Sequence, residues 1–419
     1  MATSGHVQKR RAIEALRSGV PNRDAVTELG SVQAHIEERF AKQLEDAKDD
    51  IGNEMQTPGL LVTGGFGTGK SHLLEYLKHY ALNANFICST VVISKETPLH
   101  DPAKIFRSAI QAAVVPARKG FALTEIATAL NFNSVAFTDL FKWANGASAG
   151  LSSHFPATLF LFEREKNEEI RDQIISFWSG DPLKVGELRS WLRAYGEAGT
   201  YKLERVGVRD MALHRFRFAS RLAVAAGYSG WVLLVDEVEL IGQYPNFKTR
   251  ARSYAELARW AGRLEGQAFP GLTAVFAITN TFTAEVLYDR KDEEVIRGKL
   301  WDTDSLLVSQ AERGMRLISD GATQLKEPDQ AMIEDTRDRV QGIYVQAYGW
   351  QPPPLSVERR PTSTRMREYV RRWINEWDLM RLYPGYAPDT EVFDLEIDYS
   401  ENPELETPTE DDSGELPIE

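Results

Sequence analysis

Short apolar runs alternate along the chain with longer segments in which apolar residues recur at helical spacing. The uninterrupted runs occupy residues 59–63, 85–94, 231–235 and 272–278, and a shorter one occupies 306–308. Segments with helical spacing lie beside them, at residues 71–80, 103–115, 210–226 and 253–265. Strands that are apolar on both faces are typical of parallel sheets covered by helices. The pattern therefore predicts an α/β core over residues 51–310, with a parallel five-stranded sheet.

Further helical segments flank this core and interrupt it. Residues 1–50 are predicted to form an N-terminal helical segment, with helices at 7–18, 24–29 and 31–47. Amphipathic pieces within about 116–205 indicate a helical insertion, and they lie at 123–130, 134–143, 170–178 and 185–195. Residues 311–385 are predicted to form a C-terminal helical lid. Its last helix presents one apolar face, made of Met366, Tyr369, Val370, Trp373, Ile374 and Trp377.

The net charge of −12 is concentrated at the C-terminus. Residues 389–419 contain 13 Asp and Glu and neither Lys nor Arg, so the remaining chain carries 48 acidic and 49 basic side chains. Residues 386–419 are therefore predicted to be an acidic, mostly disordered tail, either a solubilising end or a segment that docks on a partner or mimics DNA. The single cysteine, Cys88, excludes a disulfide framework and a zinc cluster. With no apolar stretch of membrane-spanning length, the sequence predicts a cytoplasmic protein.

Residues 64–71 form a complete G-x-x-x-x-G-K-S phosphate-binding loop between a predicted strand and a predicted helix. Glycines let main-chain N–H groups curl around phosphates where a Cβ would obstruct them. Lys70 can reach the β- and γ-phosphates, and the Ser71 hydroxyl can ligate Mg²⁺. The alternative is a glycine-rich turn that matches the motif by chance. The motif requires a strand before the loop and a helix after it, and the sequence has both, which favours a nucleotide site. The sequence thus predicts bound ATP and Mg²⁺, with nucleotide contacts from Gly64, Gly65, Phe66, Gly67, Thr68, Gly69, Lys70, Ser71 and His72.

Polar residues follow two of the buried runs and supply candidate catalytic groups. Asp236 ends one run and would hold Mg²⁺ together with Ser71, while Glu237 would polarise the attacking water as general base. Asn280 ends the next run and would sense the γ-phosphate. A solvated strand end and a turn cap are the alternatives for the acidic pair and for Asn280. The order of loop, acidic pair and amide favours a catalytic set.

Arginines are the remaining requirement, because a guanidinium stabilises charge that spreads over the γ-phosphate oxygens. Arg290 and Arg297 follow Asn280 and could project into a neighbouring subunit's site, with Arg297 the preferred candidate. Arg365 lies near the start of the late helix and could reach the nucleotide from the lid. Surface salt bridging is the alternative for each. The other arginines of this segment form either a solvated basic face or a DNA contact, and they are Arg359, Arg360, Arg367, Arg371 and Arg372. The turn at Val20 and Pro21 is a candidate wall for the base, although local packing explains it equally well.

In this order, the loop, the acidic pair, Asn280 and the arginine-bearing late helix resemble an AAA+ ATPase of the origin-initiator type. Residues 10–22 and 63–73 are also similar to the ATP-binding proteins of bacterial phage-exclusion (BREX) systems, the BrxC/BrxD-type P-loop family. The resemblance covers about residues 8–380. It implies a role in anti-phage defence within a multi-protein complex that includes a DNA methyltransferase and a phosphatase-like partner.

Two functions are compatible with this resemblance. The first is an oligomeric ATPase that acts on DNA or loads onto it, directly or through partners. The second is a nucleotide-gated switch that binds ATP, turns over slowly and signals through partner proteins. A small-molecule kinase is disfavoured, because no acceptor-binding motif is apparent. Initiator relatives usually carry a winged-helix DNA-binding domain after the lid, whereas only residues 381–388 separate the lid from the tail here. We therefore expect DNA contact to depend on the insertion or on a partner.

Overall fold

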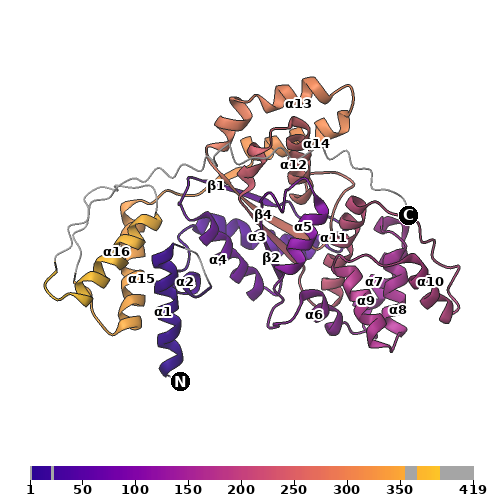
Figure 1. Ribbon diagram of the computed structural model, residues 1–419, viewed down its shortest axis with the longest axis horizontal. Helices are drawn as coiled ribbons and strands as arrows, with labels where there is room; N and C mark the ends of the chain where they lie inside the picture. Colours follow the sequence, from indigo (N-terminus) through magenta and orange to yellow (C-terminus); the bar gives the residue numbers. More distant parts are fainter. Residues whose placement is uncertain (1, 20–22, 354–365, 387–419) are drawn as a thin grey trace.

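Five parallel strands form one sheet at the centre of the molecule (Figure 1). The computed structural model describes residues 2–19, 23–353 and 366–386. Along the sheet the strand order is β2-β3-β4-β1-β5. The strands are β1 (Leu60–Gly64), β2 (Ile87–Val92), β3 (Trp231–Asp236), β4 (Leu272–Thr279) and β5 (Ala322–Gln324). The predicted α/β fold with a parallel five-stranded sheet is confirmed.

The register brings the loops after three strands to the same edge of the sheet. β4 lies between β1 and β3, with Gly64 paired to Thr279 and Val235 paired to Phe276. Parallel strands share their carboxyl edge, where ligands bind in open α/β sheets. The phosphate loop, Asn280 and the acidic pair therefore emerge side by side, although they are far apart in the sequence.

Helices cover both faces of the sheet because alternate strand residues point to opposite sides. On one face, α3 (Ala34–Asp50) and α4 (Lys70–Asn83) bury Val62, Val232 and Val275. The other face buries Leu61, Leu233 and Phe276. It is covered by α5 (Pro102–Gln111), α11 (Val208–Ala225), α12 (Phe247–Trp260) and α14 (Ser305–Ser319).

Five further helices between α5 and α11 pack beside the core, on the right of Figure 1. They are α6 (Ala122–Ala129), α7 (Val135–Asn145), α8 (His154–Arg164), α9 (Glu168–Ser179) and α10 (Val185–Ala194). The sequence pattern indicates four of them and misses α8. Residues 154–162 are all buried, so α8 has no polar face until its end and shows no amphipathic period.

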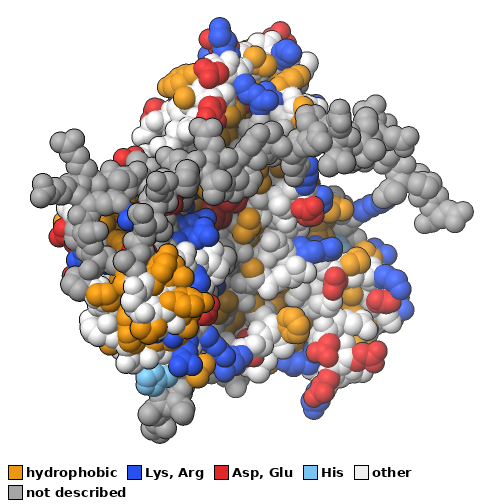
Figure 2. Space-filling view, turned by 60° about the vertical axis from the view of Figure 1, so that its left-hand side comes forward, with side chains coloured by type: hydrophobic (Ala, Val, Ile, Leu, Met, Phe, Trp, Pro, Cys, Tyr) orange, Lys and Arg blue, Asp and Glu red, His pale blue; other side chains and the backbone are white. Residues whose placement is uncertain are grey.

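The first two helices pack against the last two. α1 (Ala2–Ser18) and α2 (Arg23–Leu29) share an apolar cluster with α15 (Gln330–Tyr348) and α16 (Met366–Leu382), on the left of Figure 1. The cluster buries Ile13, Val340, Tyr344, Ile374 and Trp377. In Figure 2, hydrophobic side chains gather most densely at the lower left, while charges of both signs are interspersed elsewhere. The N-terminal helices α1 and α2 thus belong spatially with the C-terminal ones, whereas α3 belongs with the sheet.

The prediction of a strand at 306–308 is wrong, because these residues lie in α14. The Asp304 carboxylate accepts the Leu307 N–H at 3.0 Å and caps this helix, and Val308, Ala311 and Met315 are buried at helical spacing. A three-residue apolar run has no period of its own, so it fits either element. The fifth strand is β5. Within the described residues, no helix combines the length and the apolar character needed to cross a bilayer.

Candidate nucleotide-binding site

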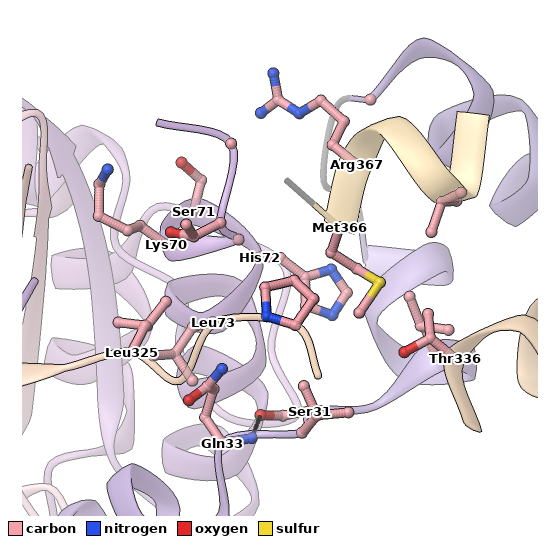
Figure 3. Close-up of a pocket in the computed structure, with 18 of the residues that line it drawn as sticks. Ser31, Gln33, Lys70, Ser71, His72, Leu73, Leu325, Thr336, Met366 and Arg367 are labelled. Carbon is pink, nitrogen blue, oxygen red and sulfur yellow. Dashed lines mark hydrogen bonds between the residues drawn. The ribbon is translucent and has the colours of Figure 1, made fainter. Parts of the chain in front are cut away.

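A cavity opens between the phosphate loop and the helices at the two ends of the chain (Figure 3). One end is polar and is lined by residues 67–72 together with Glu237 and Glu239. The other end is apolar, lined by Leu16, Leu29, Val32, Met332 and Val370, and Leu325 lies beside Gly64 of the loop. A molecule with a charged tail and a flat ring would match this division, with phosphates at the loop and a base among the aliphatic side chains.

The phosphate loop has the geometry of an anion site. Gly67 and Gly69 adopt φ values of 76° and 104°, in the left-handed region that favours glycine. α4 begins at Lys70 with no side-chain cap, so its first N–H groups are available to an anion. The Lys70 ammonium lies 3.0 Å from the Gly64 carbonyl oxygen and 3.2 Å from that of Gly65. The loop therefore places a positive charge and main-chain donors at the polar end of the cavity.

His72 joins the loop helix to the turn between α2 and α3. Its Nε2 lies 2.7 Å from the Gly30 carbonyl oxygen, which can only accept, so Nε2 carries the proton. Burial lowers the pKa of His72, although the bond to Gly30 opposes the shift. The ring also lines the cavity. A neutral imidazole here fixes the wall formed by Gly30 and Ser31 relative to the loop.

The acidic pair meets the loop at the edge of the sheet. The Ser71 hydroxyl donates to Asp236 Oδ2 at 2.6 Å, and the Glu237 N–H donates to Asp236 Oδ1 at 3.0 Å. Glu237 has a φ of 60°, a conformation that costs free energy in a residue with a side chain and that clusters at functional sites. Partial desolvation raises the pKa of Glu237, the Asp236 charge raises it further, and Lys70 opposes both. A carboxylate with a raised pKa beside the phosphate loop suits proton transfer.

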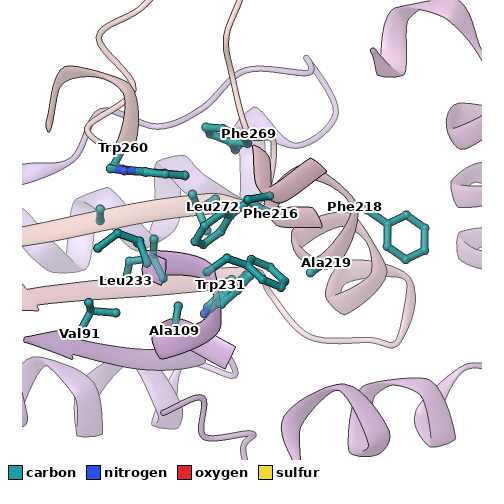
Figure 4. Packing of buried hydrophobic residues seen from close by; sticks show 14 of the residues in the cluster. Val91, Ala109, Phe216, Phe218, Ala219, Trp231, Leu233, Trp260, Phe269 and Leu272 are labelled. Carbon is teal, nitrogen blue, oxygen red and sulfur yellow. The ribbon is translucent and has the colours of Figure 1, made fainter. Parts of the chain in front are cut away.

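Aromatic packing holds the strand that carries this pair. Trp231, at the start of β3, stacks on Phe216 with 5.4 Å between ring centroids and an interplanar angle of 27° (Figure 4). Its indole N–H donates to Ser89 Oγ at 2.9 Å. Phe216 in turn packs against Trp260. Because both ends of the indole are fixed, β3 has a rigid base from which Asp236 projects.

Glu239 is a site residue that the sequence analysis did not identify. It lines the cavity two residues beyond Glu237, in the short helix η2 (Val238–Gln243). Its Oε2 is buried and has no hydrogen-bond partner within the described residues. Burial raises the pKa of Glu239 to about 7, with smaller contributions from Glu237 and Asp236. No sequence motif marks this position, because only the turn of η2 brings the side chain back to the cavity.

This carboxyl group makes stability depend on pH. Its pKa is about 7 in the folded protein against 4.5 ordinarily, so between these values the folded state binds more protons than the unfolded state. The free energy of unfolding of the wild type should therefore fall as pH rises through this window. Glu239→Gln should gain stability relative to wild type on going from pH 5 to pH 8, measured by urea unfolding without nucleotide. Glu187→Gln, at an exposed glutamate on α10, is the control, and parallel wild-type and Glu239→Gln profiles would contradict the assignment.

Asn280 lies beside the phosphate loop. Its N–H donates to the Gly64 carbonyl at 3.3 Å, and a Cβ added to Gly65 would lie 3.9 Å from the Asn280 side-chain oxygen. The side chain is exposed at the carboxyl end of β4, between the strands that carry the loop and the acidic pair. This position is compatible with a γ-phosphate contact.

The arginines occupy three different places. Arg297 lies on α13 (Asp292–Leu300), 3.1 Å from Glu312 and largely exposed, and it does not line the cavity. Arg290 donates to the Gly242 carbonyl at the end of η2. Arg365, like Val20 and Pro21, lies outside the described residues. Arg367, on α16, lines the cavity over the Phe66 ring, and Figure 3 shows it extending toward the side where Lys70 and Ser71 lie.

The sequence pattern places Arg367 only among the residues of a basic face. The neighbouring Met366 and Val370 also line the cavity, so this face of α16 is turned toward the loop. The spacing of Met366, Arg367 and Val370 predicts that they share one face of a helix. It does not predict which part of the protein that face contacts.

Ser71 and Asp236 fit a magnesium ion. Mg²⁺ prefers oxygen ligands, keeps several waters, and is usually bound by one or two protein groups together with phosphate oxygens. The hydroxyl and carboxylate, 2.6 Å apart, supply two such oxygens. Within the described residues, no group of three or more His, Cys, Asp or Glu side chains has a metal-binding arrangement.

A protein-family model described as BREX system ATP-binding protein BrxC/D matches residues 6–132 and 174–375. The matched segments include the phosphate loop, the acidic pair, Asn280 and all the residues that line the cavity. Residues 133–173, which span α7 and α8, are not matched. No curated protein and no solved structure matched the chain.

Proposed function

Because this chain belongs to the BREX system ATP-binding protein BrxC/D family, we propose that it is a Mg²⁺-dependent ATPase of anti-phage defence. The observation that carries the proposal is the 2.6 Å contact between Ser71 and Asp236. These residues belong to two separate nucleotide-site motifs, 165 positions apart, that meet at the polar end of one cavity. The shared carboxyl edge brings the strand end near the loop, but it does not by itself provide a hydroxyl and a carboxylate in direct contact.

The proposed reaction is hydrolysis of ATP to ADP and phosphate. Lys70 and the first N–H groups of α4 bind the phosphates, and Ser71 and Asp236 hold the ion. Bound Mg²⁺ would neutralise charge on the β- and γ-phosphate oxygens. Glu237 orients the attacking water and accepts its proton, a role that its raised pKa supports. Asn280 contacts the γ-phosphate from the intervening strand.

The architecture that we infer is an AAA+-type core of the origin-initiator class. α15 and α16 line the cavity opposite the loop, which supports a helical lid over residues 311–385. α6 to α10 lie between two core helices, which supports an insertion within 116–205, and the family model leaves part of this region unmatched. The N-terminal segment 1–50 and the acidic tail 386–419 complete the proposed division.

We further propose that the protein works in the cytoplasm in an oligomer or with other BREX proteins. Arg297 lies away from its own chain's cavity and is largely exposed on α13, so it could enter a neighbour's site. Mixing an Arg297→Ala chain with a Glu237→Gln chain tests this role. In the mixture, an Arg297→Ala chain keeps Glu237 and can receive Arg297 from a Glu237→Gln neighbour, so restored turnover supports supply of the arginine in trans. Full activity of Arg297→Ala alone removes the residue from the mechanism.

A nucleotide-gated switch with little turnover is the second candidate. It is favoured by the origin of the apolar lining, since Leu16, Met332 and Val370 come from three different helices. Such walls must separate before a base can leave. Steady-state turnover and stoichiometric ATP retention, each measured with and without duplex DNA, separate the two functions. DNA-stimulated turnover supports an ATPase that acts on DNA, and retention without turnover supports the switch.

The lid arginine gives a prediction of its own. Arg367→Ala should raise the KM for ATP by roughly 10- to 150-fold if the guanidinium makes one charged hydrogen bond to a phosphate, which contributes about 1.5–3 kcal/mol. Arg371→Ala, one turn further along α16 and outside the cavity lining, is the matched control. Arg365→Ala, measured in parallel, decides between the two candidates. An unchanged KM in Arg367→Ala would leave Arg365 as the lid arginine.

A further inference from the structure

We propose that a basic surface beside the nucleotide site binds the phosphate backbone of nucleic acid. The surface consists of Lys104 on α5, Arg209 at the start of α11, and Lys248 and Arg252 on α12. All four side chains are exposed. The inference rests on the proposed function only where it links nucleic acid to ATP turnover.

These cations gather around His100, in the loop after β2. The Arg209 guanidinium donates to the His100 carbonyl at 3.4 Å. Burial lowers the pKa of His100, Asp101 opposes this, and the charges of Arg252, Lys104 and Arg209 lower it further. Lys248 precedes Arg252 by one helical turn and projects from the same face of α12. Cations from three elements thus converge on one loop.

Two carboxylates near this surface are committed to other partners. Asp101 accepts the N–H groups of Ala103 and Lys104 as the cap of α5. Glu256 is fully buried and is held by Arg209 and Arg259. A third carboxylate, Glu96, is exposed, and its pKa is lowered mainly by hydrogen bonds from its own backbone and Ser94, with smaller contributions from the charges of Lys95 and Lys104. Lys104, Lys248 and Arg252 form no ion pair within the described residues. Lys248 and Arg252 are exposed and have no carboxylate partner within the described residues. They favour a polyanion as the occupant, because its phosphates supply the negative charge that this face of the protein lacks.

The surface is positioned to influence the nucleotide site. Val92 of β2 pairs with Asp236, so the loop that follows β2 lies beside the acidic pair. The His100 ring packs edge-on against Tyr244, with 5.2 Å between centroids. Tyr244 directly follows η2, which carries Glu239, and its carbonyl is held by Arg250 at 2.7 Å. Phosphates bound to the four cations would therefore lie beside the His100 loop, which contacts Tyr244 at the end of η2. η2 directly follows Glu237, the proposed general base.

Charge reversal at the three unpaired cations tests the binding. Full-length wild type and a Lys104→Glu/Lys248→Glu/Arg252→Glu variant are titrated against labelled random-sequence duplex DNA and single-stranded DNA of equal length. We expect the variant to lose at least about tenfold in affinity near 0.1 M salt, with a salt slope lower by about one for each phosphate contact removed. The two DNA forms show which backbone spacing the surface prefers. Arg209 is left intact because it supports buried Glu256.

The control is Lys184→Glu/Arg193→Glu, which reverses the charge of the residue that precedes α10 and of one in its last turn, at the right in Figure 1. An equal loss in the control and the triple variant would overturn the proposal, as would unchanged binding in the triple variant. Polyglutamate that competes as well as DNA would also overturn it in favour of an acidic protein segment.

His100→Ala tests the link to turnover. We expect it to keep DNA affinity and DNA-independent turnover but to lose DNA stimulation. Turnover without DNA reports on the proposed ATPase alone, so failure of that function is seen separately from failure of the DNA surface. Unaltered stimulation in His100→Ala would remove the path through Tyr244.

Discussion

Glu237→Gln should bind ATP with wild-type affinity and hydrolyse it about 10²–10⁴ times more slowly, the contribution typical of a general base. The amide keeps the size of the side chain and can still contact water, but it cannot accept a proton. Glu237 takes no part in the Ser71–Asp236 contact, so the proposed ion site should remain. Binding is measured with a fluorescent ATP analogue, and turnover by phosphate release under single-turnover conditions.

Glu239→Gln is the matched control, since it places the same substitution two residues away in the same cavity. We expect it to reduce turnover far less than Glu237→Gln, because Glu239 follows the strand end instead of standing directly beside Asp236. Wild-type turnover in Glu237→Gln would show that the base had been misassigned. A larger loss in Glu239→Gln would move the role to that residue.

Lys70→Ala should lose ATP binding, with an affinity decrease of about thirtyfold or more. Removing one partner of a buried charge pair commonly costs about 2–5 kcal/mol, and a triphosphate that loses its ammonium partner falls in this class. The same change removes the hydrogen bonds from Lys70 Nζ to the Gly64 and Gly65 carbonyls, which hold the loop in its conformation. Isothermal titration with MgATP measures the effect.

Lys78→Ala provides the control on the same helix, because Lys78 pairs with Glu75 outside the cavity. The unfolding midpoint without nucleotide should be similar in both variants. Lys70→Ala that retains wild-type affinity would contradict the nucleotide site and with it the proposed ATPase.

Sequence patterns predict the elements that carry a local signal. The phosphate loop needs glycines, a lysine and a serine at fixed spacing, so residues 64–71 are recognisable from their order in the chain alone. β3 and β4 are recognisable as apolar runs, and their polar ends as candidate site residues. The start of α14 resembles a strand because residues 306–308 have no period, and its helical spacing becomes clear only when residues 308–318 are considered together.

The sequence by itself determined the chemistry available to this protein: a phosphate loop, an acidic strand end and a strand-end amide. Only the tertiary structure decided which side chains share the cavity. Strand order places Asn280 between the loop and Glu237, and the packing of α1 against α15 and α16 brings Leu16 and Arg367 to the nucleotide wall. Local propensities reach a few residues along the chain, whereas burial of apolar faces joins segments hundreds of residues apart. For that reason the surroundings of Arg367, Glu239 and His100 were set by the fold and not by any motif.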